Sequence, residues 1–156
     1  MVQQITEGVS ITVETFYQPD QSSPLNSEYL FAYRITIENL TIYPVKLLSR
    51  HWHIIDSNGT HREVEGDGVV GQQPVIEPGN TYQYTSAANL HSDMGKMYGT
   101  YLVENLFNKK KLLYVLEIGD LSSFAFELEK TWSFPSVGKF TTVFRKQLYE
   151  FPDGIR

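Results

Sequence analysis

Bulky apolar side chains occupy every second position of Phe31-Ala32-Tyr33-Arg34-Ile35-Thr36-Ile37-Glu38. Successive side chains of a β-strand point to opposite faces of its sheet, so this period of two predicts a strand with one buried face. The stretch from Val9 to Tyr17 alternates in the same way. Similar short stretches predict further strands at residues 45–56, 61–66, 81–87, 97–103 and 112–118.

Turn-forming residues separate these strands. Asn58-Gly59 predicts a tight hairpin with a two-residue type I′ turn, because both residues accept the positive φ that such a turn needs. Pro78-Gly79 predicts a second turn. No amphipathic helix is evident before residue 119. About seven short strands with frequent turns predict an all-β fold, an immunoglobulin or fibronectin III-like β-sandwich.

The composition of the 156 residues changes towards the C-terminus. Residues 1–120 are expected to form the sandwich domain. Residues 121–156 are an atypical C-terminal extension that is rich in aromatic residues. Within this extension we expect a strand at 141–144 and a short helix at 144–149.

Charge and cysteine content exclude several classes of protein. The formal net charge is −5, whereas a nucleic-acid surface needs clustered positive charge. Cysteine is absent, which excludes disulfides, thiol catalysis and cysteine metal sites. The N-terminus lacks the features of a signal peptide, and no apolar run approaches the roughly 20 residues of a membrane helix. We therefore expect a cytoplasmic protein that neither spans a membrane nor binds nucleic acid.

The pattern GxGxxG is formed by Gly66, Gly68 and Gly71. A dinucleotide site needs a helix after these glycines, but the two prolines that follow prevent one. The loop amides are instead a candidate anion site, with Arg50 and His51 on the neighbouring strand. The simpler interpretation, which we favour, is that the glycines satisfy a bulge and a turn that need positive φ.

Histidines and carboxylates in the same region raise the question of a metal site. A two-residue turn pairs Asp56 with His61, which places His61 on the sheet face opposite to His51 and His53. This register predicts that the three histidines cannot share one metal ion. It groups four potential ligands on the face of His61: Asp56, His61, Glu63 and Glu65. These suit a hard cation such as Mg²⁺, or Co²⁺, but a solvated charged face is simpler, so we favour no metal and no cofactor.

Hydrolytic chemistry has little support in the sequence. No GxSxG nucleophile motif is present, and the chain has no cysteine. The run Lys109-Lys110-Lys111 is expected at a hairpin tip. Charged residues there oppose strand-to-strand aggregation, and partner binding by the run is the less favoured alternative.

Several stretches of the chain together resemble the ApaG family. One of them is Val64-Glu65-Gly66-Asp67-Gly68-Val69-Val70-Gly71-Gln72-Gln73-Pro74. The others are residues 31–40, 47–52, 56–59, 75–79, 84–86, 94–95 and 97–101. The resemblance covers roughly residues 8–103 and implies a fibronectin III-like sandwich. Residues 114–119 only loosely resemble the closing strand of the family, because they lack its proline.

The resemblance also implies a link to cobalt and magnesium efflux or resistance, without established catalytic residues. Our first hypothesis is therefore a non-enzymatic binding protein that acts through a protein partner or a phosphate-bearing ligand, as a monomer or a homo-oligomer. Direct binding of a divalent cation is the alternative. A nucleotide hydrolase that uses Arg50 is a weaker one.

Overall fold

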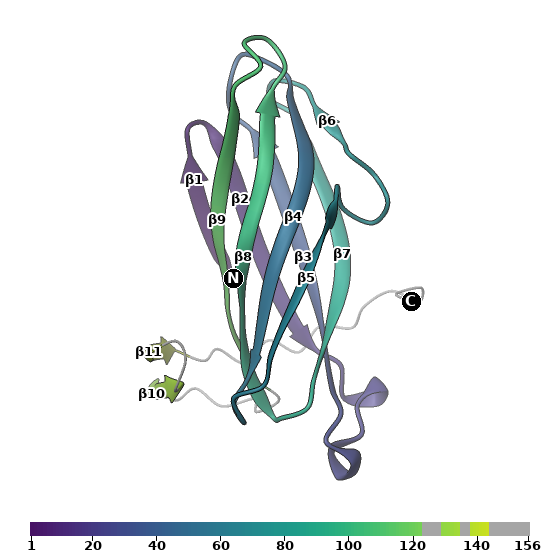
Figure 1. The fold of residues 1–156 in the computed structure, drawn as a ribbon, viewed down its shortest axis with the longest axis vertical. Coiled ribbons are helices and arrows are strands. Elements are labelled where there is room, and N and C mark those ends of the chain that lie inside the picture. Colours follow the sequence, from purple (N-terminus) through teal and green to yellow (C-terminus); the bar gives the residue numbers. More distant parts are fainter. Residues whose placement is uncertain (123–128, 135–137, 144–156) are drawn as a thin grey trace.

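The computed structural model describes residues 1–122, 129–134 and 138–143, and its main body is two packed antiparallel sheets (Figure 1). The first sheet has the order β1-β2-β3-β7, formed by Val2–Thr6, Val9–Tyr17, Tyr29–Asn39 and Thr81–Leu90. The second has the order β5-β4-β8-β9, formed by His61–Asp67, Val45–Asp56, Met94–Asn105 and Lys111–Ser122. The short strand β6 (Val75–Ile76) also pairs with β4. Two 3-10 turns, η1 (Pro19–Gln21) and η2 (Pro24–Asn26), connect β2 to β3.

The connections between the strands are those of a Greek-key sandwich. β3 pairs with β7 and β4 pairs with β8, so each sheet joins strands that are distant in the chain. The described residues contain no α-helix, and the predicted all-β, immunoglobulin or fibronectin III-like sandwich is confirmed. Every strand predicted from alternation is present. The sequence pattern does not predict β1 or β6.

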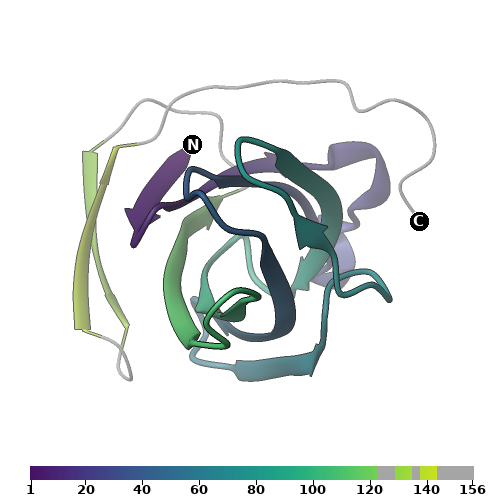
Figure 2. The same ribbon diagram turned by 90° about the horizontal axis from the view of Figure 1, so that it is seen from above.

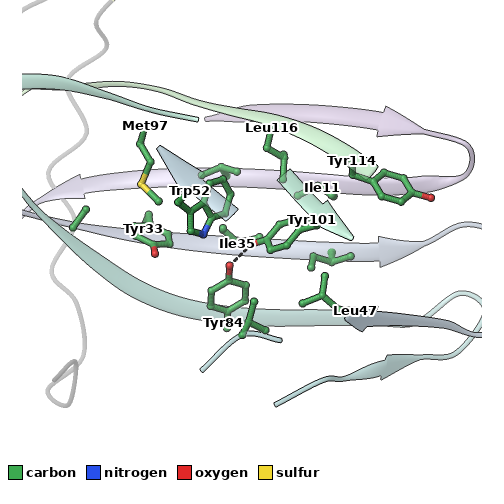
Figure 3. Packing of buried hydrophobic residues seen from close by; sticks show 14 of the residues in the cluster. Ile11, Tyr33, Ile35, Leu47, Trp52, Tyr84, Met97, Tyr101, Tyr114 and Leu116 are labelled. Carbon is green, nitrogen blue, oxygen red and sulfur yellow. Dashed lines mark hydrogen bonds between the residues drawn. The ribbon is translucent and has the colours of Figure 1, made fainter. Parts of the chain in front are cut away.

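Apolar side chains from both sheets fill the space between them, and the sheets curve around this core when seen along the strands (Figure 2). Trp52 on β4 meets Tyr101 on β8 edge-on, with ring centroids 5.2 Å apart. The hydroxyl of Tyr101 is hydrogen-bonded to that of Tyr84 on β7, which links the two sheets through side chains (Figure 3). Burial raises the pKa of both tyrosines, so both phenols stay protonated at neutral pH.

Asn39, the last residue of β3, is fully buried. Its Nδ2 donates hydrogen bonds to Tyr43 O at 2.8 Å and to Ile76 O at 2.9 Å. Its Oδ1 accepts from Thr41 N at 3.0 Å and from Thr41 Oγ1 at 2.7 Å. All four hydrogen-bonding sites of the amide are therefore satisfied. The side chain fixes the turn between β3 and β4 and holds β6 beside it.

Towards the C-terminus, β9 continues to Ser122, past the boundary predicted at residue 120. β10 (Glu129–Phe134) pairs with β11 (Gly138–Val143), which overlaps the strand expected at 141–144. The helix expected at 144–149 lies outside the described residues. That 121–156 is a distinct extension stays a prediction. Lys109 and Lys110 lie in the turn between β8 and β9, as expected.

An ion pair on the first sheet predicts a pH-dependent contribution to stability. Arg34 Nε lies 2.7 Å from Glu14 Oε2, and this hydrogen bond lowers the pKa of Glu14. A carboxylate with a lowered pKa stabilises the folded state above its unfolded pKa, and that contribution is lost as the pH falls through the folded pKa. Because both side chains are partly exposed, we expect Glu14→Gln to cost about 0.5 kcal/mol at neutral pH. The cost should vanish at about pH 2. Urea unfolding at the two pH values measures it, and an equal cost at both contradicts the expectation.

Candidate functional site

A three-residue loop closes the β4–β5 hairpin, in place of the predicted two-residue turn. Gly59 N donates to Asp56 O at 2.9 Å, and Asp56 N donates to Thr60 O at 2.9 Å. Gly59 has a φ of 90°, whereas Asn58 is not among the residues with positive φ. This is the pattern of a type I turn followed by a left-handed glycine, which adds one residue to the loop.

The added residue shifts the pairing of the two strands, so Ile55 rather than Asp56 lies opposite His61. A shift of one residue moves every side chain of a strand to the other face. His61 therefore shares the outer face of the sheet with His51 and His53. The prediction that His61 lies on the face opposite to His51 and His53 is wrong, and the reason for excluding a shared metal ion no longer holds.

The outer face of the hairpin carries a compact group of ring nitrogens and one carboxylate, which we call the imidazole cluster: His51, His53, His61 and Glu63. His51 Nε2 lies 2.9 Å from Glu63 Oε2, and His53 Nδ1 lies 3.0 Å from His61 Nε2. Glu63 Oε1 is 3.7 Å from His53 Nδ1 and 3.9 Å from His61 Nε2. Side chains alternate between the two faces along each strand, so residues two apart lie on the same face. His-x-His on β4 and His-x-Glu on β5 therefore each project two side chains to the outer face.

Neighbouring groups hold the cluster and set its charge. The hydrogen bond with His51 lowers the pKa of Glu63, and the other two histidines act in the same direction. Glu63 is thus a carboxylate at neutral pH. Tyr98 on β8 stacks on His53, with ring centroids 4.8 Å apart and planes 12° from parallel. Stacking restricts rotation of the His53 ring, while the cluster as a whole stays accessible to solvent.

Asp56 does not lie with the other predicted metal ligands. It is fully buried on the inner face, away from His61, Glu63 and Glu65 on the outer face. Its Oδ2 accepts a hydrogen bond from His91 N at 2.8 Å, and Arg62 Nη2 lies 3.9 Å from its Oδ1. The predicted four-ligand set is therefore not formed. Asp56 instead ties the hairpin to the turn between β7 and β8.

The glycine pattern forms a tight loop beyond β5. Val70 and Gly71 have φ values of 43° and 78°, and Val69 and Gln72 exchange backbone hydrogen bonds of 2.7 and 2.9 Å across them. These are the features of a two-residue type I′ turn. Gly68 also has positive φ, and a Cβ there would lie 1.9 Å from Gln72 O. The loop geometry therefore needs glycine at this position.

The candidate anion-binding residues come together only in part, because Arg50 contacts Gly66 and Gly68 whereas His51 lies apart from them. Arg50 Nη1 donates to Gly68 O at 2.8 Å, with Asp67 O at 3.4 Å. A Cβ at Gly66 would lie 3.4 Å from the same nitrogen, so the guanidinium packs against that glycine. Gly68 N donates to Leu48 O at 2.8 Å. His51 projects from the opposite face of β4 and belongs to the imidazole cluster.

Val70 is the strained residue of this loop, because a β-branched side chain disfavours positive φ. Asparagine accepts that conformation, so we expect Val70→Asn to raise the free energy of unfolding by about 1 kcal/mol. Val75, another exposed valine without positive φ, is the matched control, and Val75→Asn should give no gain. Denaturant unfolding measures both. Equal changes in the free energy of unfolding of the two variants would show that backbone strain at Val70 does not explain the effect.

Comparison with known proteins agrees with this architecture. A family model described as the ApaG domain matches residues 19–105, which include both the imidazole cluster and the glycine loop. The chain is a member of the ApaG family. Protein ApaG of Sinorhizobium fredii is 43% identical over 104 residues, which cover 67% of this chain and 80% of that protein. Protein ApaG of Brucella anthropi is 45% identical over an equal length.

A solved structure extends the likeness to three dimensions. The crystal structure of the ApaA protein from Bordetella pertussis is 38% identical and superposes with a TM-score of 0.70. The match covers 73% of this ApaG chain and 92% of that protein. Within the described residues, no helix has the length and apolar character needed to cross a membrane.

Proposed function

We propose that this ApaG chain is a non-enzymatic binding protein that acts in cobalt and magnesium efflux or resistance through a protein partner. The observation that carries the proposal is the glycine loop, which holds the exposed side chain of Val70 in a strained backbone conformation. Strain of this kind persists only where the surrounding structure imposes it, and it concentrates at binding sites. Membership of the ApaG family supports the link to cation resistance.

The geometry of the loop favours a protein over a phosphate-bearing ligand. The amides of Gly68, Val69 and Gln72 already donate to carbonyl groups, and Arg50 is engaged by the loop itself. A phosphate would have to displace these hydrogen bonds. A partner needs no such displacement, since the rigid tip presents an apolar side chain that is 56% exposed. A preorganised surface also loses little entropy on binding.

Affinity capture with a matched variant tests this proposal. The full chain and Val70→Asn are immobilised, and the proteins retained from a bacterial lysate are quantified by mass spectrometry. We expect at least one protein to be retained by the original chain and depleted roughly tenfold or more on the variant. Identical sets of retained proteins would contradict the proposal, because Val70→Asn leaves the loop folded.

Calorimetry tests the alternative that the ligand is a phosphate-bearing molecule. Pyrophosphate and dinucleoside polyphosphates are titrated into the full chain and into Arg50→Ala. We expect no saturable heat with either protein. Saturable binding that is lost in Arg50→Ala would favour a phosphate-bearing ligand instead. Cytoplasmic location, oligomeric state and the lack of nucleic-acid binding stay predictions from the sequence.

A further inference from the structure

We propose that the imidazole cluster is a binding site for a divalent transition-metal cation of the zinc class, with His51, His53 and Glu63 as ligands. His61, whose Nε2 lies 3.0 Å from His53 Nδ1, supplies the fourth ligand. The side chains project from the two strands of one hairpin onto the outer face of the second sheet. The proposal does not rest on the partner surface at Val70, so either can fail while the other holds.

The spacing of the ligand atoms is close to that of a tetrahedral site. Zinc–nitrogen bonds of 2.0–2.1 Å place neighbouring ligand atoms of a tetrahedron about 3.3 Å apart. The ligand atom of His53 lies 3.0 Å from that of His61 and 3.7 Å from Glu63 Oε1. His51, His53 and Glu63 together offer ligand atoms that all lie within 4.8 Å of one another. Small rotations of partly exposed side chains are enough to close the remaining difference.

Two ring nitrogens of the cluster point at each other, and a third points at the Glu63 carboxylate. His53 Nδ1 and His61 Nε2 face each other at 3.0 Å, so one of them donates a proton to the lone pair of the other. Glu63 bridges to His51 at 2.9 Å. A divalent cation that replaces the shared proton would satisfy all of these lone pairs at once. The paired strands fix the backbone positions, and Tyr98 restricts the His53 ring, so little order has to be gained on binding.

The chemistry of the ligands selects the class of cation. Imidazole nitrogen suits Zn²⁺, Co²⁺, Ni²⁺ and Cu²⁺, whereas Mg²⁺ requires an octahedral shell of oxygen atoms. The cluster offers three imidazoles and a single carboxylate. Glu65, which lies opposite His51 on the same face, adds negative charge. The Lys96 ammonium lies 5.8 Å from the centre of the Tyr98 ring, which stacks on His53.

Zinc binding to the full chain tests the site. Metal-free protein is titrated with ZnCl₂ in competition with a chromogenic chelator, and CoCl₂ reports the coordination number through its visible absorption. We expect one Zn²⁺ per chain, a four-coordinate Co²⁺ spectrum, and no displacement of zinc by excess MgCl₂. His51→Gln and His53→Gln should each weaken zinc binding by roughly tenfold or more.

His91 provides the matched control, because its exposed side chain lies outside the cluster and His91→Gln should bind zinc with unchanged affinity. Urea unfolding of the metal-free variants checks that each is folded. The proposal is overturned if the original chain binds no zinc saturably, or if folded His51→Gln or His53→Gln keeps full affinity. It is also overturned if His91→Gln weakens binding equally, if Mg²⁺ displaces zinc, or if one ion binds two chains.

Discussion

Asn39→Asp should lower the free energy of unfolding by about 3–5 kcal/mol, although the two side chains have nearly the same shape. The amide donates to two carbonyl oxygens, Tyr43 O and Ile76 O. A carboxylate cannot donate to either, and it would leave a negative charge in a fully buried site facing both oxygens. Loss of this amount is a large fraction of the stability of a single domain.

Urea unfolding at neutral pH measures the effect of Asn39→Asp. The exposed Asn80, in the adjoining turn, offers the same substitution as a control, and Asn80→Asp should change stability by no more than about 0.5 kcal/mol. Acid should partly restore the Asn39→Asp variant, since a protonated carboxyl donates one hydrogen bond. A loss at Asn39 no larger than that at Asn80 would show that the hydrogen bonds of the buried amide do not stabilise the fold.

Gly99→Ala is expected to destabilise the sandwich by about 3 kcal/mol or more, even though it adds one methyl group. Gly99 on β8 lies opposite Trp52 on β4. A Cβ there would lie 2.0 Å from His51 O and 2.5 Å from Cε3 of the Trp52 ring. Neither the backbone of a central strand nor a buried tryptophan can move away without disturbing the core.

Thermal and urea unfolding of Gly99→Ala measure this loss. Thr100→Ala changes the next residue of the same strand, on its outer face, and should cost less than about 1 kcal/mol. Because His51 O is one of the atoms that would be displaced, Gly99→Ala should also disturb the imidazole cluster. A fold as stable as the original would mean that β4 and β8 can separate at this point.

The strands whose sequence shows a recognisable pattern were predictable, whereas β1 and β6 were not. Alternation identifies β2, β3, β4 and β8, where buried residues recur at every second position over part of each strand. The side chains of β1 are exposed at every position except the last, so no periodic pattern marks it. β6 has two residues, too few to show a period.

The register of the β4–β5 hairpin was mispredicted because Asn58-Gly59 fits two kinds of turn. Both turns accept Gly59 at positive φ, and they differ by one residue in the loop. The cost of burying charged side chains distinguishes the two turns, because each turn sets a different register. The predicted register places Glu63 and Glu65 on the inner face beside Trp52, whereas the observed register places Val64 opposite Trp52.

The hydrogen-bond partners within the candidate anion site could not be predicted from a sequence motif. The sequence identifies the glycines and Arg50, and positive φ at Gly68 and Gly71 agrees with the simpler interpretation of a turn. The partners of the guanidinium and of the loop amides depend on tertiary packing. For the same reason, the strain at Val70 becomes evident only from the backbone angles.

Loop length, rather than residue identity, decides which chemistry the β4–β5 hairpin presents to solvent. Loss of one residue between Asp56 and Thr60 would turn His61 and Glu63 to the inner face of the sheet and bring Arg62 and Val64 to its outer face. We therefore expect selection to act more strongly against insertions and deletions in this loop than against most substitutions in it. Among relatives, an alignment gap here would separate proteins that keep the surface histidines together from those that have dispersed them.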